Sequence, residues 1–281
     1  MSTKKRIVIG VTISILGIVV IATMFGIWFK TARTENITIR GSTTVLPIAQ
    51  KVAEAYMEDH PNVFISVSGG GSSVGIQSVG EGIAEIGMAS RDLKDEEKSR
   101  YPNLNPIVIA KDAITIIVHP DNPITTLTLE QIRGIYNGTY TNWKEVGGPD
   151  QEIVVINRDS ASGTREFFWE HVMHKDDFVA TAIEKNSNGA VKQTVTQTPN
   201  AIGYVGLGYL DSSVKAIKIK MNGAEIEPTV ANVLNGKYPI ARSLYMITNG
   251  EPKGLVKDFI AFVLSEEGQR IVEEEGFVPI K

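Results

Sequence analysis

The chain has 281 residues, of which 42% are hydrophobic and 21% charged, so it has the length of two domains and too much apolar content for a disordered protein. It contains no cysteine, which excludes disulfides, thiolate metal sites, a cysteine nucleophile and a lipid-modified cysteine. Its formal net charge of −4 offers no basic surface for a polyanion, so we expect no nucleic-acid partner.

The first predicted element is a transmembrane helix. From Ile7 to Phe29 the chain carries no charge, and this length suffices to cross the hydrocarbon core of a bilayer. Basic residues at positions 4–6 precede it, which places the N-terminus in the cytoplasm and the rest outside. A cleaved signal peptide is the alternative. Its apolar part is usually shorter, and Trp28 and Phe29 form a poor cleavage context, so we expect an uncleaved signal anchor.

Charge is distributed unevenly along the chain. All five basic residues before Glu35 lie in a stretch without acidic residues, which leaves 23 basic against 32 acidic residues in the remainder. The part expected outside the cytoplasm therefore has a formal net charge of −9.

After residue 35, strand-like apolar runs alternate with amphipathic helix-like runs. The predicted strands span residues 37–40, 63–67, 86–89, 107–109, 114–119, 153–157 and 243–248. The predicted helices span residues 47–58, 73–79, 164–173, 253–264 and 266–274, and another begins at a capping box formed by Thr128 and Gln131. This alternation predicts an α/β fold with largely parallel sheets. Residues 176–237 are less periodic, and their elements cannot be ordered from the pattern.

Three turns rich in Gly, Ser and Thr each follow a predicted strand and precede a predicted helix. They span residues 41–44, 69–73 and 158–164. A helix N-terminus presents unpaired N–H groups and a partial positive charge, hydroxyls add further donors, and glycine allows close approach of the backbone. A single turn is explained by ordinary N-capping. Three together predict a shared oxyanion pocket at the carboxyl ends of the strands.

Two arginines accompany these turns. Arg158 lies in the third turn, and Arg91 follows another short strand. A guanidinium is planar and permanently charged, and it can donate hydrogen bonds to two oxygens of an anion at once. An isolated arginine, however, more often forms a surface ion pair. The adjacent Asp159 and Asp92 are expected to pair with Arg158 and Arg91 and so to orient the two guanidinium groups.

Six sequence blocks make the chain similar to a known family, the substrate-binding proteins of phosphate ABC transporters, or PstS family. The blocks are GSTTVLP at residues 41–47, GGSSVG at 70–75, IGMASR at 86–91, NWKEVGG at 142–148, RDSASGTR at 158–165 and AIGYV at 201–205. They follow the family's order and span nearly all of the chain after residue 35.

The resemblance implies a two-lobed type II periplasmic-binding-protein fold, preceded here by the single N-terminal transmembrane helix. The expected parts are an N-terminal segment of residues 1–35, lobe one of residues 36–116 and 244–281, and lobe two of residues 117–243. The implied ligand is inorganic phosphate, bound between the lobes for delivery to the permease subunits of an ABC transporter. Such a protein is not an enzyme and needs neither a cofactor nor a metal.

The resemblance also implies the binding residues. The expected phosphate contacts are Ser42, Thr43, Thr44, Ser72, Ser73, Ser90, Arg91, Arg158, Ser162, Gly163 and Thr164. Some family members place an aspartate directly after the serine of the third strand, where it accepts the proton of hydrogen phosphate. Arg91 occupies that place here, which leaves Asp92 and Asp159 as candidate acceptors. Ala161 stands where a glycine is frequent, a change that is tolerable if its φ is negative.

Other interpretations stay open at this point. Ser73 lies in a G-x-S-x-G pattern, the nucleophile elbow of α/β-hydrolases, and His119, His171 and His174 are available as bases. The last two histidines, with the aspartates that follow them, suggest either a metal site or a solvated helix end. An anchored oxyanion sensor or scavenger, or a protein for arsenate or sulfate, would need the same pocket.

Overall fold

The computed structural model describes residues 34–280. The contacts of the chain divide it into two units, Met1–Glu35 and Asn36–Lys281. The two largest hydrophobic core clusters of the second unit lie in its two different halves. None of the helices within residues 34–280 has the length and hydrophobicity to span a bilayer. The predicted transmembrane helix lies outside the described residues.

One nine-stranded sheet runs through both halves of the second unit in the order β2-β1-β3-β12-β4-β8-β6-β7, with β9 paired to β4. Its strands are β1 (Glu35–Gly41), β2 (Val63–Ser68), β3 (Ile86–Ala89), β4 (Leu104–Val118), β6 (Val154–Arg158), β7 (Ile183–Lys185), β8 (Ala201–Gly206), β9 (Lys215–Ala216) and β12 (Ala241–Asn249). A second, three-stranded sheet contains β5 (Thr126–Thr128), β10 (Lys218–Met221) and β11 (Ala224–Ile226).

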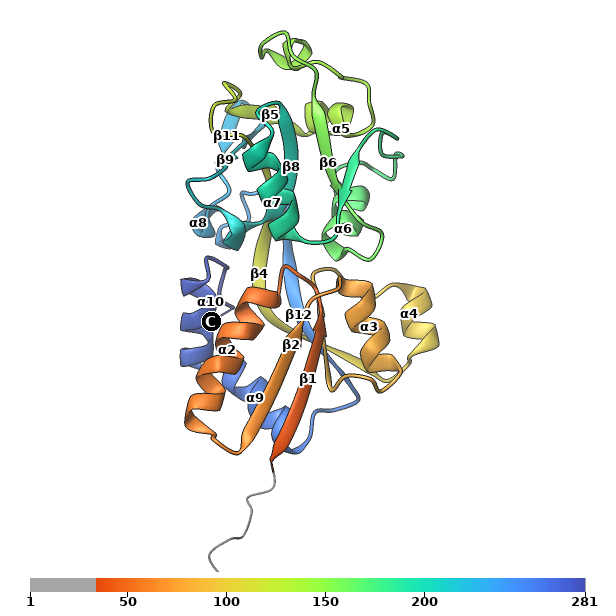
Figure 1. The fold of residues 1–281 in the computed structure, drawn as a ribbon, viewed down its shortest axis with the longest axis vertical. Helices are drawn as coiled ribbons and strands as arrows, with labels where there is room; N and C mark the ends of the chain where they lie inside the picture. The colour runs from red at the N-terminus through yellow and green to blue at the C-terminus, as the bar shows by residue number, and fades with distance from the viewer. Residues whose placement is uncertain (1–33, 281) are drawn as a thin grey trace, which may run out of the picture. The chain divides into compact units, whose positions relative to one another are not determined.

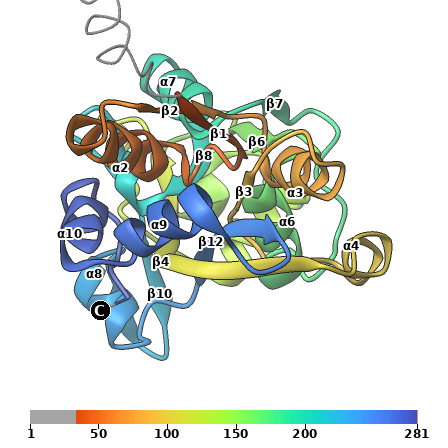
Figure 2. The same ribbon diagram turned by 90° about the horizontal axis from the view of Figure 1, so that it is seen from below.

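Helices cover both faces of lobe one, the lower half in Figure 1. Its helices are α2 (Leu46–Asp59), α3 (Ser72–Gly80), α4 (Asp95–Arg100), α9 (Gly254–Val263) and α10 (Glu266–Glu274). The apolar faces of α2, α9 and α10 pack together against one face of the sheet, where Ile39, Val52 and Phe259 are buried. The helix α3 lies on the other face (Figure 2). Its Ile76 packs there in one cluster with Ala89 and Ile247.

Lobe two has its own core. Its helices are α5 (Leu129–Tyr136), α6 (Gly163–His171), α7 (Asn188–Gln197) and α8 (Val230–Leu234), with short 3₁₀ helices η1 (Trp143–Val146) and η2 (Leu207–Tyr209). The core centres on aromatic side chains, where Tyr136 packs edge-on to Phe168 and Phe168 stacks on Tyr204 at 4.3 Å between ring centroids. Two cores of this kind are the physical basis for two lobes.

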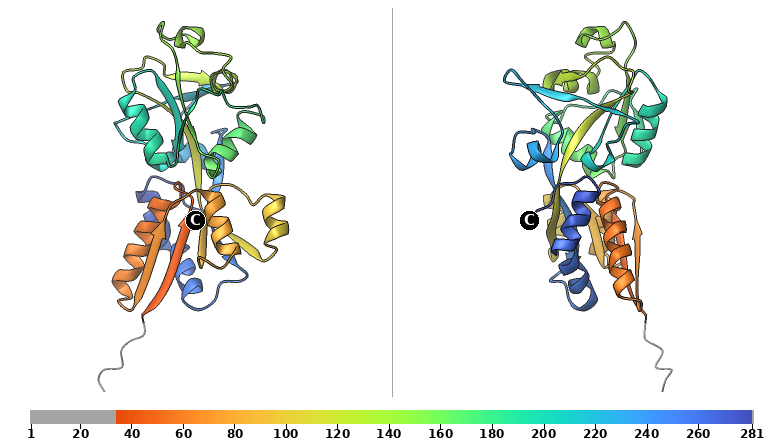
Figure 3. Two further views of the ribbon diagram at one scale, coloured as in Figure 1. Left: turned by 45° about the vertical axis from the view of Figure 1, so that its right-hand side comes forward. Right: turned by 90° about the vertical axis from the view of Figure 1, so that its left-hand side faces the viewer.

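The strands β4 and β12 connect the lobes (Figures 1 and 3). In β4, Ala110 belongs to the core of lobe one and Ala113 to the core of lobe two. In β12, Leu244 belongs to the core of lobe one, and Ala241 packs against the core of lobe two. The two strands pair antiparallel, with a register shift between Leu244 and Tyr245. The exact boundaries expected at residues 116/117 and 243/244 stay a prediction.

Most predicted elements are found within a residue or two of the expected bounds, including the Thr128/Gln131 capping box at the start of α5. Two expectations are wrong. The strands predicted separately at residues 107–109 and 114–119 form the single 15-residue strand β4. The main sheet is also mixed rather than largely parallel, because β12 runs antiparallel to both β3 and β4, and β4 runs antiparallel to β8.

Candidate functional site

Polar residues from both lobes meet where β4 and β12 pass from one lobe to the other. The first turn, at the start of α2, brings Thr43 and Thr44, and the second, at the start of α3, brings Ser72. From lobe two, the third turn brings Thr164 at the start of α6. Thr44 Oγ1 lies 3.0 Å from Thr164 Oγ1, a side-chain contact between residues 120 positions apart. The three turns singled out in the sequence therefore converge, as expected from their common position between strand and helix.

The ordinary capping explanation holds for only one of these turns. Ser162 is the N-cap of α6 and accepts a hydrogen bond from the Arg165 N–H at 3.2 Å. The helices α2 and α3 have Val45 and Gly71 at their N-caps and no side-chain cap bond. Their hydroxyls are nonetheless buried. Those of Thr43 and Thr44 contact lobe two, at Asn188 and Thr164. Ser42 Oγ accepts from the Thr44 N–H and Ser72 Oγ accepts from the Ser90 N–H, both within lobe one. The buried hydroxyl residues of the site are Ser42, Thr43, Thr44, Ser72, Ser90, Ser162 and Thr164.

Glycine is needed where the lobes approach each other. A Cβ on Gly163 would lie 2.2 Å from Ser72 Oγ, and one on Gly71 would lie 2.4 Å from the Ala161 carbonyl oxygen. Gly71 has a φ of 96°, whereas Ala161 is not among the described residues with positive φ, so the alanine is tolerated there.

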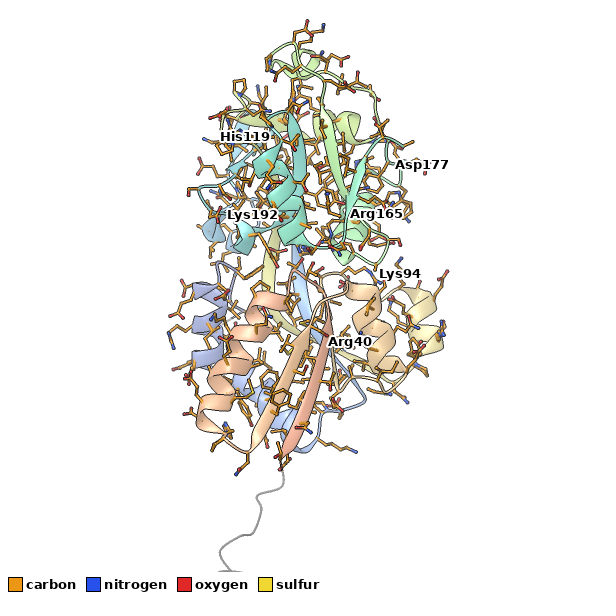
Figure 4. The ribbon with its side chains drawn as sticks, in the orientation of Figure 1. Arg40, Lys94, His119, Arg165, Asp177 and Lys192 are labelled. Carbon is orange, nitrogen blue, oxygen red and sulfur yellow. The ribbon has the colours of Figure 1, made fainter. Side chains whose placement is uncertain are left out.

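Direct polar contacts also join the lobes outside the central cluster. The Ser73 backbone N–H donates to the Ala161 carbonyl at 3.2 Å. At the rim, Lys94 Nζ of lobe one lies 2.8 Å from a carboxylate oxygen of Glu166, and Lys94 and Arg165 lie on facing sides of the junction in Figure 4. The lobes are therefore closed on each other in this structure.

Arg158, at the start of the third turn, is a buried arginine that forms no ion pair with a carboxylate within residues 34–280. Its side chain is buried, with 1% of the residue exposed. Its Nε donates to the Lys185 carbonyl at 3.1 Å and its Nη2 donates to the Asn186 carbonyl at 3.3 Å. Burial lowers the pKa of the Arg158 guanidinium, but an arginine stays charged in a protein. A buried positive charge held only by carbonyls favours an anion beside it.

Unlike Arg158, Arg91 has a carboxylate partner. Its guanidinium forms a bidentate ion pair with Glu97 of α4, at 2.8 and 2.7 Å, and donates to Ser73 Oγ at 3.1 Å. The partner of Arg91 therefore comes from the charged run of residues 95–98 in α4. The structure places Ser73 and Arg91 together beside α4, and their role as phosphate contacts stays a prediction.

The two aspartates expected to hold the arginines do not pair with them. Asp92 is exposed and accepts a hydrogen bond from the Tyr245 hydroxyl at 2.5 Å, while Arg91 pairs with Glu97. Asp159 forms no ion pair with Arg158 in the described part of the chain. Its Oδ1 atom is buried and has no hydrogen-bond partner there.

A buried ion pair that the sequence reasoning missed lies between the connecting strands. Arg242 of β12 donates to Asp112 of β4 through Nε at 2.9 Å and Nη2 at 2.7 Å, and both side chains are at most 1% exposed. Burial raises the pKa of Asp112, and the Arg242 guanidinium opposes that shift. Arg242 also donates to the Ser90 carbonyl and to Thr44 Oγ1, so the pair is part of the same cluster.

Asn188 is the second residue that the sequence reasoning missed. It opens α7, is fully buried, and donates from Nδ2 to both Thr43 Oγ1 and Thr44 Oγ1. The signal in the sequence was a Ser-Asn-Gly helix start at residues 187–189, inside the stretch that lacked periodicity.

The hydrolase alternative finds no support. Ser73 Oγ accepts from Arg91, and within residues 34–280 no hydrogen bond joins Ser73 to a histidine. A pocket of about 650 Å³ on lobe two is lined by none of the predicted site residues.

Comparison with a family model and with solved structures identifies the class of protein to which this chain belongs. Residues 30–267 match the family model described as a PBP superfamily domain. A solved protein of Clostridium perfringens, described as a phosphate ABC transporter substrate-binding protein with bound phosphate, has 42% sequence identity and a TM-score of 0.82, with 88% of this chain and all of that chain covered. An ABC-type phosphate transport receptor of Vibrio cholerae has 37% identity and a TM-score of 0.71, over 86% of this chain and 99% of that one. The fold is therefore the two-lobed periplasmic-binding-protein fold.

The family within that class follows from the curated relatives. The phosphate-binding protein PstS of Borreliella burgdorferi is 38% identical over 254 residues, covering 87% of this chain and 90% of its own length. The phosphate-binding protein PstS of Bacillus subtilis is 34% identical over 247 residues, covering 87% of this chain and 81% of its own length. This chain belongs to the PstS family.

Proposed function

We propose that this chain binds inorganic phosphate between its two lobes, outside the cytoplasm, and delivers it to an ABC transporter for import. The observation that carries the proposal is the buried Arg158 guanidinium, which forms no ion pair within residues 34–280. Its charge interacts with that of Arg242, which donates a hydrogen bond to the Thr44 hydroxyl of the cluster. Such a cluster has donors and positive charge in excess, and a tetrahedral oxyanion supplies the matching acceptors and negative charge.

The proposed phosphate contacts are supported by the contacts of Thr44 with Thr164 and of Ser72 with Ser90, and by the close approach of Gly163 to both serines. The full set of proposed contacts is Ser42, Thr43, Thr44, Ser72, Ser90, Arg158, Ser162, Gly163 and Thr164. We leave Ser73 and Arg91 out of direct contact, because the guanidinium of Arg91 is already paired with Glu97 and bonded to Ser73. In this proposal Arg91 stabilises the start of α3 and does not bind the anion.

Asp159 is the proposed acceptor for the proton of hydrogen phosphate. Asp92 is exposed and bonded to Tyr245. The carboxylate of Asp112 already receives hydrogen bonds from Leu207 and Arg242. Asp159 Oδ1 is buried and unpartnered within the described residues, and the negative charge of this carboxylate partly opposes the lowering of the Arg158 pKa by burial.

This acceptor sets the expected selectivity. Hydrogen phosphate donates a proton to it, whereas sulfate at neutral pH has none to donate and leaves a buried carboxylate oxygen unpaired. That costs about 1–3 kcal/mol or more, which corresponds to a preference for phosphate of about 5-fold to 150-fold or more.

Calorimetric titration at neutral pH tests the function. We expect saturable binding of one phosphate per chain, much weaker binding of sulfate, and a smaller preference in Asp159→Asn. The matched control is Asp92→Asn, which should keep the preference of the wild type. Equal affinities of the wild-type chain for the two anions would contradict the proposal.

Membrane attachment is a further part of the proposal. It rests on the uncharged stretch of residues 7–29 and on the preceding basic residues, with no cysteine available for a lipid. Fractionation of cells that produce the full chain tests it: the anchored chain stays with the membrane after a high-salt wash and keeps its full mass. A sensor or scavenger would use the same pocket, and loss of phosphate uptake on deletion distinguishes the transporter component from both.

A further inference from the structure

Asn188 reaches from lobe two to two of the proposed phosphate-binding hydroxyls of lobe one. Its Nδ2 lies 3.1 Å from Thr43 Oγ1 and 3.0 Å from Thr44 Oγ1, and its backbone N–H donates to Thr43 Oγ1 at 3.4 Å. The side chain is fully buried, so water does not compete for these bonds. These contacts join residues about 145 positions apart and form only when the lobes meet.

The orientation of the Asn188 amide follows from its third partner. The Gly206 backbone N–H lies 3.2 Å from Oδ1, and an N–H can only donate. The amide oxygen must therefore face Gly206, and the amide nitrogen must face the two threonines. Both hydrogens of the amide nitrogen are then donated, one to each hydroxyl.

Both lone pairs of the Thr44 hydroxyl are consequently occupied. Thr44 Oγ1 receives one hydrogen bond from Asn188 and a second from Arg242 Nη2 at 3.3 Å, and neither of these groups can accept. The Thr44 O–H is left to donate, to Thr164 or to a ligand. Thr43 Oγ1 receives two hydrogen bonds from Asn188 and is left to donate in the same way.

We propose that Asn188 is a positioning residue that fixes the Thr43 and Thr44 hydroxyls as donors and so sets the specificity of the site for oxygens that accept. The inference rests on the proposed function and deepens it. An unconstrained hydroxyl binds a donating or an accepting group equally well. A hydroxyl whose lone pairs are filled by Asn188 rejects a ligand group that must donate there, and it meets an anionic oxygen without reorienting.

A double-mutant cycle on phosphate affinity tests whether Asn188 acts through the hydroxyl. The variants are Asn188→Leu, Thr44→Val and the combination, each titrated calorimetrically with inorganic phosphate as the full chain. We expect Asn188→Leu to raise the Kd for phosphate at least about tenfold when it is made in the wild type. In the Thr44→Val background the same substitution should raise Kd by a factor at least about three times smaller, because residues in contact are energetically coupled. Asn122→Leu, at another buried asparagine of lobe two, should lower thermal stability and leave phosphate affinity unchanged.

Asn188→Asp is the second variant, because it keeps the size of the side chain and the oxygen that faces Gly206. A carboxylate accepts where the amide donated, so the threonine hydroxyls turn toward it and away from phosphate. We expect a larger loss of affinity than for Asn188→Leu at pH 7, and a loss relative to wild type that shrinks as the pH falls and the carboxyl becomes a donor.

The outcomes separate the inference from the function beneath it. If the wild-type chain does not bind phosphate, the proposed function fails. If the wild type binds phosphate but the effects of Asn188→Leu and Thr44→Val are additive, or Asn188→Asp binds like the wild type at pH 7, then Asn188 does not set the polarity of the hydroxyls and the inference is wrong.

Discussion

Replacing Arg158 with methionine removes the charge that the account places against phosphate. Methionine keeps most of the volume of the buried stem, so the change bears mainly on the guanidinium. Of its five N–H groups, two donate to the carbonyls of Lys185 and Asn186, which leaves three for a ligand. A hydrogen bond to a charged group contributes about 1.5–3 kcal/mol, and a fork uses two.

The expected loss for Arg158→Met is therefore about 3–6 kcal/mol of phosphate binding free energy, or a factor of roughly 10² to 10⁴ in Kd. Arg158→Lys should fall between methionine and the wild type, because it keeps the charge and loses the planar fork. Arg133→Met is the matched control: it removes the same charge from lobe two, but Arg133 is partly exposed and pairs with Asp176.

Isothermal titration with phosphate measures the affinities, and thermal unfolding with and without phosphate gives an independent readout. A ligand that binds only the folded state stabilises it in proportion to the logarithm of its concentration over Kd. The shift of Tm on adding phosphate should therefore nearly vanish in Arg158→Met and persist in Arg133→Met. An affinity of Arg158→Met within about twofold of the wild type would refute the placement of the site.

Three further predictions concern the surroundings of the site. Gly163→Ala should weaken phosphate binding, because its Cβ would meet Ser72 Oγ at 2.2 Å across the lobes, whereas Gly189→Ala has no atom within 4 Å of the new Cβ and should bind normally by calorimetry. Equal affinities of these two variants would show that the lobes close differently. Asp112→Asn should lower the free energy of unfolding by about 3–5 kcal/mol in denaturant titrations, since it leaves Arg242 buried without its counter-ion, and adding Arg242→Met should recover much of that loss. A double variant no more stable than Asp112→Asn alone would contradict this reasoning. Burial alone would raise the pKa of Glu97, but hydrogen bonds from Arg91 and the Lys94 N–H outweigh it, so the net pKa lies below its usual value. A carboxylate of lowered pKa stabilises the fold above its unfolded pKa near about 4 and loses this effect as the pH falls through the folded pKa. Glu97→Gln should therefore be less stable than the wild type at pH 7, with a gap that closes in acid, and a gap independent of pH would exclude the ion pair as its cause.

The part of the site that could be predicted from the sequence is the part built from local pattern. A strand, a Gly/Ser/Thr turn and a helix start lie consecutively in the chain. The turns that hold Thr44, Ser72 and Thr164 can therefore be identified from the sequence pattern alone. The strand pairings make β6 of lobe two run opposite to β1 of lobe one, so the turns at the carboxyl ends of these two strands face each other across the junction of the lobes.

Contacts between distant segments were not predictable in this way. Asp112 and Arg242 are 130 positions apart, and their pairing depends on the register of β4 against β12. The polar pair Lys111 and Asp112 also interrupts the apolar pattern, which made β4 look like two strands. Its continuity follows from the arginine on the opposite strand, since a buried carboxylate is tolerated when it is paired.

The partners of the two arginines were misassigned for a related reason. Sequence adjacency favoured Asp92 for Arg91, but the chain turns so that Glu97 of α4 reaches the guanidinium. For Arg158, the parallel pairing of β6 with β7 brings the Lys185 carbonyl beside it, so no adjacent carboxylate is required. Adjacent side chains on an extended segment point to opposite sides, which disfavours such pairs.

A crystal structure of the full chain grown with phosphate tests the central claim most directly. The account predicts a tetrahedral anion between the lobes, within hydrogen-bond distance of the Arg158 guanidinium and of hydroxyls from both lobes, including Thr44 and Thr164. Phosphate bound elsewhere on the chain, or closed lobes with no anion at this cluster under conditions where calorimetry shows saturation, would contradict it.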